Sequence, residues 1–507
     1  MVFNFYQNVT KNFNFIKSIN NLQELYLCQL SILKSDTKTL IPLSRVNSKE
    51  KDTLKDYLKN DNLIKYLYQK NDGEVLGEIL IKVVEKDESV NIFAEELKEK
   101  IDHDEFNNVI SNLNKWLRNT LLARQINYDF EFYNEVYNGP VDLILTAGPM
   151  VSHYENIYSL DAVNHGWNKD WSKHLDSFEE KFSDFIGTKY ALATSSCTGA
   201  IYLSLLASGI GEGDEVIVPE LTWVATASAI KYTGAKPIFA DIDIDTWCID
   251  TSELESLVSE KTKAIIPVHL YGNPAKMDEI ILFAKKHNLI VIEDAAPAIG
   301  ATFDGTKVGS FGDFGCFSFQ GAKLLVTGEG GMVVTNNEDL FKKFKKLWDH
   351  GRVPGTFWID ELGYKYKMSN LQAAFGLGQL ENIEVLIEAK RRNYSRYFKN
   401  LSQLDGIKLS KAGKNTESIH WMTSILLNQE MGLSRDRFSD DLRKLNIDTR
   451  PVFPSISQYP IWGQKYGENK NSKIVGENAI NLPSGVNLTD NEIDYISESI
   501  ISLIESV

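Results

Sequence analysis

Short apolar runs alternate with amphipathic runs through most of the chain after about residue 141. The runs Glu215–Val218, Pro237–Ala240, Ala264–Val268 and Leu289–Ile292 are short and largely apolar, which is typical of strands buried on both faces. Between the last two, Met277–His287 has apolar residues at helical spacing. This alternation predicts βαβ units that build a mostly parallel sheet covered by helices. Ligands of such sheets bind at the carboxyl ends of the strands.

The two ends of the chain have different patterns. Residues 1–140 are rich in Asn, Lys, Asp and Glu, with helical spacing in Phe106–Leu122 and a strand-like alternation in Glu74–Val84. They carry no motif with an evident chemical function, so we predict a small α-rich or α+β accessory domain of unknown role. Apolar residues at helical spacing predict one long helix over Asn370–Leu401, leading into a smaller α/β segment. The expected parts are 1–140, 141–369 and 370–507.

Composition limits the functional classes. The 507 residues, 43% of them hydrophobic and 24% charged, are typical of a globular protein with several domains. A formal net charge of −15 argues against binding to nucleic acid or to an anionic membrane surface. The four cysteines form no zinc-binding spacing, so we expect no metal site and reduced thiols. Without a signal-peptide pattern or a run of about 18 apolar residues, we expect a cytoplasmic protein.

Three polar positions near predicted strand or helix ends are candidates for chemistry. Lys323 lies in CFSFQGAKLLVTGEGG, residues 316–331, and a lysine at a strand end is either solvated or able to form a Schiff base with an aldehyde cofactor. Asp294 ends a buried strand, where it can bind a protonated pyridine nitrogen or cap the next turn. The hydroxyl-rich turn 193–200 precedes an apolar helix, where it can bind phosphate or simply cap the helix through Ser196 or Thr198.

Taken together and in this order, these segments resemble the DegT/DnrJ/EryC1/StrS family of sugar aminotransferases, from about residue 141 to the C-terminus. The stretches that carry the resemblance are TAGP at 146–149, GDEVIVP at 213–219, PVHLYG at 267–272, EDAA at 293–296, FSFQGAK at 317–323 and GEGG at 328–331. The resemblance implies the α/β fold of type I pyridoxal 5′-phosphate (PLP) aminotransferases. That fold has a large, mostly parallel sheet domain and a small C-terminal α/β domain.

The resemblance also implies roles for individual residues. Lys323 would be the covalent anchor of PLP and the carrier of its catalytic proton, and Asp294 the partner of the pyridine nitrogen. Trp223 would stack on the cofactor ring. The remaining cofactor contacts would come from Cys197, Thr198 and Ser318 at the phosphate.

Three features depart from the family pattern. Pro297 stands where many members have a side chain that hydrogen-bonds the cofactor hydroxyl. Lys365 and Lys367 replace the Asn and Arg that the family often shows, and that Asn reaches the phosphate of the neighbouring subunit. A lysine carries charge to such a contact but not the same geometry. Ser457 stands where many members have a histidine near the substrate. We expect these changes to affect the choice of substrate.

The closest resemblance is to the perosamine-synthase-like branch, which implies amino transfer from an amino acid, usually glutamate, to a nucleotide-linked 4-keto-6-deoxyhexose for surface polysaccharide. A homodimer with shared active sites is also implied. The substrate-binding candidates are Arg352, Lys367, Arg450 and Ser457, with Lys365 at the cofactor and with Arg391 and Arg392 as further candidates for the diphosphate. Two alternatives stay open: a PLP-dependent sugar dehydratase, in which histidine replaces the lysine, and a cofactor-binding sensor or scaffold.

Overall fold

The computed structural model describes residues 38–42, 63–70, 75–84, 89–93, 143–464 and 466–506. The chain forms two compact units, one of residues 1–140 with 151–161 and the other of residues 141–150 with 162–507. The predicted helix Phe106–Leu122 lies outside the described residues. None of the helices in the part of the chain that the structure describes is long and apolar enough to cross a membrane.

The described strands of the first unit form one antiparallel sheet. Its order is β1-β2-β3-β4, with β1 (Lys38–Pro42), β2 (Leu63–Lys70), β3 (Val75–Val84) and β4 (Ser89–Phe93). The strand-like run predicted at Glu74–Val84 is β3. Successive strands pair with their neighbours in sequence, which is the simplest antiparallel arrangement.

A seven-stranded sheet forms the centre of the second unit, in the order β5-β13-β12-β9-β8-β6-β7. The pairs from β12 to β7 are parallel, and β13 runs antiparallel to both of its neighbours. The predicted mostly parallel sheet is therefore confirmed. The strands are β5 (Tyr190–Thr194), β6 (Glu215–Pro219), β7 (Lys236–Ala240), β8 (Thr262–Ile265), β9 (Ile290–Asp294), β12 (Phe314–Ser318) and β13 (Gly331–Thr335).

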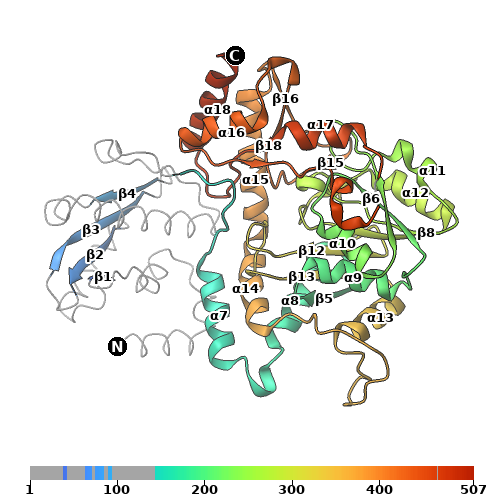
Figure 1. Cartoon of the computed structure of the whole chain (residues 1–507). Helices are drawn as coiled ribbons and strands as arrows, with labels where there is room; N and C mark the ends of the chain where they lie inside the picture. The colour runs from blue at the N-terminus through green and yellow to red at the C-terminus, as the bar shows by residue number, and fades with distance from the viewer. Residues whose placement is uncertain are drawn as a thin grey trace. The chain divides into compact units, whose positions relative to one another are not determined.

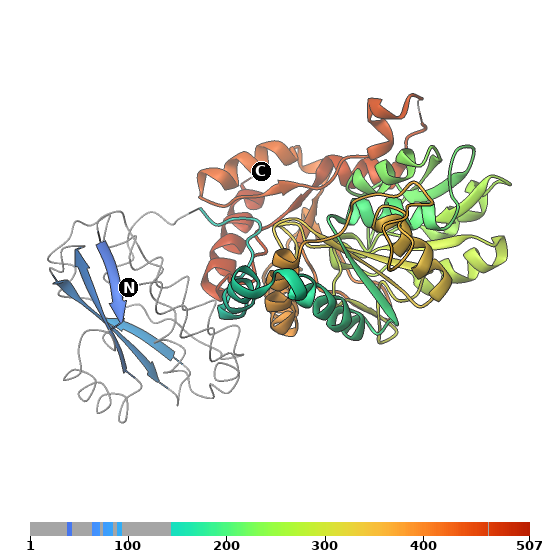
Figure 2. The ribbon, with the colours of Figure 1, turned by 90° about the horizontal axis from the view of Figure 1, so that it is seen from below.

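Helices cover both faces of this sheet, as Figures 1 and 2 show. Side chains of β12 alternate between the faces: Phe314 and Cys316 join the apolar core around α9, whereas Phe317 packs against Phe182 of α8 with ring centroids 5.0 Å apart. This two-sided burial explains why the strands read as apolar runs. The helices are α8 (Lys173–Ile186), α9 (Cys197–Ala207), α10 (Ala225–Tyr232), α12 (Met277–His287) and α13 (Glu338–Trp348).

The prediction of a single helix over Asn370–Leu401 is wrong, because the segment is divided in two. The structure has two helices, α14 (Asn370–Glu381) and α15 (Ile383–Leu401), which follow one another along one direction in Figure 1. Asn382 separates them with φ −107° and ψ 8°, and its amide bonds the Gln379 carbonyl at 3.1 Å in a tighter turn. Asparagine favours helix ends over helix interiors, while the apolar periodicity on either side continues and hides the break.

The C-terminal part of the second unit has its own antiparallel sheet, in the order β14-β16-β18-β17. Its core lies between this sheet and α15, α16 and α18, with Tyr397, Phe438 and Ile496 fully buried. The elements are β14 (Ile407–Leu409), β16 (Ser424–Leu427), α16 (Arg435–Lys444), β17 (Arg450–Pro451), α17 (Lys470–Asn478), β18 (Ala479–Asn481) and α18 (Asp490–Glu505).

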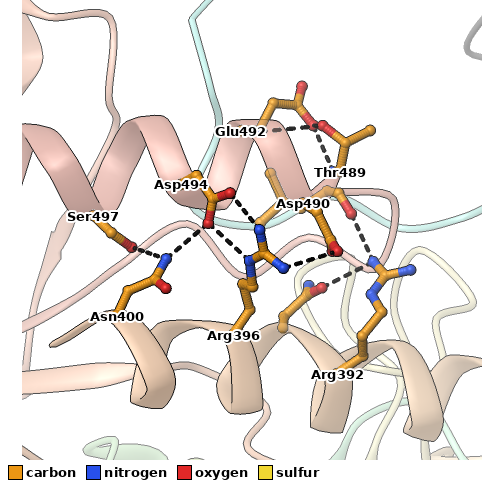
Figure 3. Close-up of polar contacts among 10 residues, drawn as sticks. Arg392, Arg396, Asn400, Thr489, Asp490, Glu492, Asp494 and Ser497 are labelled. Atoms are coloured by element: carbon orange, nitrogen blue, oxygen red, sulfur yellow. Dashed lines mark hydrogen bonds and ion pairs between the residues drawn. The ribbon is translucent and has the colours of Figure 1, made fainter. Parts of the chain in front are cut away.

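Polar contacts join α15 to α18 (Figure 3). Arg396 binds the Asp494 carboxylate and also Asp490, the latter at 3.4 Å between nitrogen and oxygen. The hydrogen bonds from Arg396 hold the pKa of Asp494 at about 2. At the start of α18, Thr489 and Glu492 form a capping box that satisfies the first amides of the helix. These contacts hold α18 against α15.

Shorter elements complete the described chain. A three-stranded sheet has the order β11-β10-β15, formed by β10 (Thr302–Phe303), β11 (Thr306–Lys307) and β15 (Thr416–Glu417). The remaining α-helices are α7 (His153–His165) and α11 (Leu254–Leu257). The chain therefore returns from the C-terminal part to pair with a hairpin that precedes β12.

Gly315 tests how tightly β12 is packed. A Cβ at this position would lie 2.0 Å from the Gly309 carbonyl oxygen, which is backbone and cannot move aside without shifting its turn. We expect Gly315→Ala to lower the free energy of unfolding by about 3 kcal/mol, measured by denaturant titration. Gly467→Ala, where a Cβ would meet nothing within 4 Å, is the matched control and should leave stability nearly unchanged. Equal stability of the two variants would contradict this packing.

Candidate active site

The carboxyl ends of β5, β12 and β9 bring most of the predicted site residues to one edge of the large sheet. Backbone pairing places Cys316 of β12 opposite Asp294 of β9. It places Ser318 of β12 opposite Gly331, and Gly331 in turn opposite Thr194 at the end of β5. The turn into α9 follows β5, and the lysine turn follows β12. The phosphate, pyridine-nitrogen and lysine candidates therefore belong to one edge.

Asp294 is a buried carboxylate at this edge. The Thr226 hydroxyl donates to its Oδ2 at 2.7 Å, and the Ala296 amide donates to its Oδ1 at 3.1 Å. Burial raises the pKa of Asp294, while these two hydrogen bonds and the nearby Lys323 lower it. A carboxylate accepts about four hydrogen bonds, so this one can take a further donor. A protonated ring nitrogen fits that requirement, because its charge would offset the cost of burial.

Lys323 lies in the turn after β12, close to Asp294 and Cys197. Burial lowers the pKa of Lys323 to about 8, against the opposing effects of the Asp294 carboxylate and the Cys197 thiol. Its Nζ atom lies 3.8 Å from the centre of the Trp421 ring. An amine with a pKa near 8 exists in both protonation states at neutral pH, so it can accept and return a proton.

The start of α9 is suited to an anion. Ser196 caps the helix, its Oγ accepting the Gly199 amide at 3.1 Å, which leaves the amides of Cys197 and Thr198 ahead of the first intrahelical bonds. Such amides and the helix dipole attract phosphate. A Cβ on Gly331 would lie 2.6 Å from the Cys197 nitrogen, so β13 passes directly against this turn. Ser196 provides the cap, and Thr198 keeps its hydroxyl for another partner.

Two further cofactor candidates, Ser318 and Trp223, border this edge. Ser318 is buried at the end of β12, and its Oγ accepts the Gln320 amide at 3.4 Å. Trp223 follows β6 and is 58% exposed, with its ring 5.6 Å from that of Phe453. An exposed indole held on one side by another aromatic ring can stack on a planar ligand.

Residues 365–367 run beside the phosphate turn. Lys367 pairs with Thr194 through an isolated antiparallel bridge, and the Tyr366 carbonyl accepts the Ser195 amide at 2.6 Å. Lys367 Nζ lies 4.3 Å from the Trp171 ring and 4.7 Å from the Trp348 ring, and burial lowers the pKa of Lys367.

The remaining charged candidates lie on other elements: Lys365 is predicted at the cofactor, and Arg352 and Arg450 at the substrate. Lys365 is exposed and pairs with Asp349 at 3.7 Å. Arg352 belongs to the loop between α13 and α14, where its guanidinium lies 5.7 Å from the Phe357 ring. Arg450 is exposed on β17 and pairs with Asp448 at 3.3 Å.

The last three candidates are engaged within the protein. Ser457 is buried and its hydroxyl donates to Glu220. Arg391 donates to the Ser418 carbonyl at 3.2 Å, and Arg392 donates to the Leu488 carbonyl at 2.6 Å.

Sequence reasoning missed the residues that hold the Glu293-Asp294 pair. Glu293 and Asp294 point to opposite faces of β9, since side chains alternate along a strand. Glu293 accepts the amides of Gly309, Phe311 and Gly312 at 2.7, 2.7 and 2.8 Å, and the buried His269 Nε2 lies 3.0 Å away. Because His269 Nδ1 accepts the Ala275 amide, Nε2 carries the proton that bonds Glu293. This network fixes the turn that precedes β12.

Thr226 was also missed. Its hydroxyl comes three residues after Trp223, and the spacing puts it one helical turn further on. Nothing in the local sequence indicates that the hydroxyl reaches Asp294. Trp421 lies still further along the chain and carries no motif that points to Lys323.

Known proteins match this chain over the same region. Residues 152–501 match the DegT/DnrJ/EryC1/StrS aminotransferase family. The chain belongs to that family. A relative is GDP-perosamine synthase of Escherichia coli O157:H7, 41% identical over 355 residues, covering 69% of this chain and 96% of the relative.

Solved structures agree with this assignment. This aminotransferase resembles Helicobacter pylori PseC, an aminotransferase involved in the biosynthesis of pseudoaminic acid, with TM-score 0.69 and 27% identity over 72% of this chain and all of that one (100%). It also resembles the PLP form of a putative sugar aminotransferase from Streptococcus pneumoniae, with TM-score 0.66 and 28% identity over 72% of this chain and 99% of that one. The enzyme uses pyridoxal phosphate, as the sequence predicts.

Thr226→Val tests the hydrogen bond that Thr226 donates to Asp294. The substitution keeps the shape and removes the donor to Oδ2, so the pKa of Asp294 should rise further and less of it should be ionised. We expect PLP affinity to fall about tenfold or more near neutral pH and to recover partly as the pH is raised. The dissociation constant from absorbance titration measures this.

Thr233→Val is the control, because that hydroxyl bonds only local backbone at the end of α10. Unchanged PLP affinity in Thr226→Val, or a loss that grows with pH, would contradict the assigned role.

Proposed function

We propose that the protein transfers an amino group from an amino acid, L-glutamate in the first instance, to a nucleotide-linked 4-keto-6-deoxyhexose. The observation that carries this proposal is that Lys323 lies near the buried Asp294, at the ends of the adjoining strands β12 and β9. The reaction would supply amino sugars for surface polysaccharide. Support for the sugar comes from the relative at 41% identity, whose name is GDP-perosamine synthase.

Each residue of the site has a distinct task in this proposal. PLP, when bound, supplies an aldehyde that holds the amino group and a ring that delocalises negative charge. Lys323 anchors the cofactor and moves the proton, a role that its lowered pKa suits. Asp294, whose carboxylate is held by Thr226, would bind the protonated ring nitrogen. The amides of Cys197 and Thr198, with Ser318, would bind the phosphate, and Trp223 would cover the ring.

The substrate side is assigned to residues around this edge. Lys367 lies beside the phosphate turn and between two tryptophans, and we propose that it contacts the anionic part of the sugar nucleotide. Ser457 bonds Glu220, so its influence on substrate choice is proposed to pass through that buried acid. Arg352 and Arg450 remain candidates for the diphosphate. Pro297 has no side-chain donor for the cofactor hydroxyl.

Lys323→Ala tests the reaction. The wild-type enzyme with PLP and glutamate should convert GDP- or TDP-linked 4-keto-6-deoxyhexose to an aminated product, detected by mass spectrometry with 2-oxoglutarate released. The variant should lose at least about a thousandfold in kcat, because it lacks both the anchor and the proton carrier. Lys285→Ala, on the surface helix α12, is the matched lysine control.

The outcomes separate the alternatives. A deoxygenated sugar formed without consumption of the amino donor would support a dehydratase instead. PLP binding with no turnover of any keto sugar would favour a sensor or scaffold.

We propose that the enzyme is a homodimer with shared active sites. The loop between α13 and α14, which projects in Figure 1, exposes Phe357 by 94%, Trp358 by 71% and Leu362 by 85%. Apolar side chains gathered on one loop favour an interface. The same connection carries Lys365, which the family resemblance places at the phosphate of a neighbouring subunit.

Replacing this loop surface tests the dimer. Light scattering should give a dimer for the wild type and a shift toward monomer for the double variant Phe357→Ser/Trp358→Ser, with a parallel loss of activity. Leu282→Ser removes a comparably exposed apolar side chain from α12 and should change neither. A monomeric, fully active wild type would refute the proposal.

We also propose a cytoplasmic location. Among the described residues, Cys197, Cys248 and Cys316 are buried free thiols. Unpaired cysteines are typical of a reducing compartment, and nucleotide-linked sugars would be available there.

A further inference from the structure

Trp421 contacts the lysine turn at two points. Its ring lies 3.8 Å from Lys323 Nζ, and its Nε1 donates to the Ala322 carbonyl at 3.0 Å. The tryptophan comes from the segment between β15 and β16, so it belongs to the C-terminal part of the chain and not to the strand that carries Lys323. One side chain therefore holds both the backbone of the turn and the amine at its tip.

The indole itself is held in place from two directions. Lys390 of α15 is buried, and its Nζ donates to the Trp421 carbonyl at 2.9 Å and also to the Ser484 carbonyl. The Tyr271 ring stacks near the Trp421 ring, 6.0 Å away and inclined by 23°. A ring fixed at its backbone, its indole nitrogen and by a neighbouring aromatic ring has little freedom to move away from Lys323.

The stack continues to the ring that is proposed to cover the cofactor. Tyr271 lies 5.4 Å from Phe453 at an angle of 21°, and Phe453 lies 5.6 Å from Trp223. Offset or tilted rings at these separations attract one another. The aromatic series Trp421–Tyr271–Phe453–Trp223 thus joins the lysine amine to the other side of the site.

The contact between the Trp421 ring and Lys323 favours one protonation state of the amine. The amine of Lys323 faces the Asp294 carboxylate, the Cys197 thiol and the Trp421 ring. The negative face of an indole attracts a cation, and more strongly where water is excluded. Burial acts in the opposite direction and lowers the pKa of Lys323. The ring therefore favours the protonated amine at a place where burial disfavours it.

We propose that Trp421 is a positioning residue for Lys323. The face of the Trp421 indole receives the protonated Lys323 amine whenever that amine is not bonded to the cofactor. The ring keeps the Lys323 amine beside Asp294 while the amine carries the proton. It also restricts the other rotamers of the lysine side chain. This inference rests on the proposed role of Lys323 in proton transfer.

Competitive labelling with acetic anhydride tests the proposal on the full-length protein. The protein is saturated with pyridoxamine 5′-phosphate, which has no aldehyde and leaves Lys323 unbonded. The pH dependence of acetylation at Lys323, followed by peptide mass spectrometry, gives the pKa of its amine. Trp421→Leu keeps an apolar side chain without a ring, so the pKa of Lys323 should fall by about one unit. Trp421→Phe keeps a weaker ring face and should restore part of that fall.

A matched control is Trp462→Leu. Trp462 is also buried and donates through Nε1 to a backbone carbonyl, but it packs against Phe239 of the edge strand β7. Its loss should leave the pKa of Lys323 unchanged. A pKa that stays the same or rises in Trp421→Leu would overturn the proposal, since the ring would then only exclude water.

A second variant and a measurement without cofactor complete the test. If Trp421→Leu does not fold, the Trp421→Phe variant alone should show a smaller fall in the pKa, and no fall would again overturn the proposal. Repeating the labelling without any cofactor separates this inference from the proposed function. A wild-type protein that aminates no sugar would refute the function while the effect of Trp421 on the amine could still be measured.

Discussion

A buried carboxylate at a strand end is the constraint on which this site depends. Burial raises the pKa of Asp294, and the donors Thr226 and the Ala296 amide, with Lys323 nearby, act against it in favour of the carboxylate. The parallel pairing of β9 and β12 brings the lysine turn to that carboxylate. The same carboxylate suits a cationic ring nitrogen. Because burying the Asp294 charge is unfavourable, hydrogen-bond donors and a cation are needed around it.

The neighbouring acid has a structural task. Glu293 is satisfied by three backbone amides and by His269, all within the protein, so it shapes the turn before β12 and leaves the ligand edge to Asp294. The side chains of these two adjacent acids point to opposite faces of the strand, so one can serve structure while the other stays available for the proposed chemistry. The C-terminal part of the chain completes the site through Trp421, so the lysine depends on contacts from both parts of the second unit.

Much of the fold follows from local patterns. The range predicted for α12 agrees with the structure at both ends, and β6, β7, β8 and β9 lie within a few residues of the apolar runs that predicted them. The break at Asn382 was not predicted, because the apolar periodicity continues across it. The roles of the individual site residues stay predictions, as do the three expected domain boundaries. The family, the fold class and the cofactor are confirmed.

The sequence by itself indicated which residues are candidates for chemistry, and that Asp294 ends a buried strand and Lys323 follows one. Strand ends can be read from periodicity, and the carboxyl ends of parallel strands share an edge. Only the tertiary structure decided that Thr226 reaches Asp294, that Ser457 bonds Glu220, and that Trp421 lies against the lysine amine. These contacts join segments far apart in the chain. A local pattern records which face of an element is buried, but not which distant side chain will pack against it.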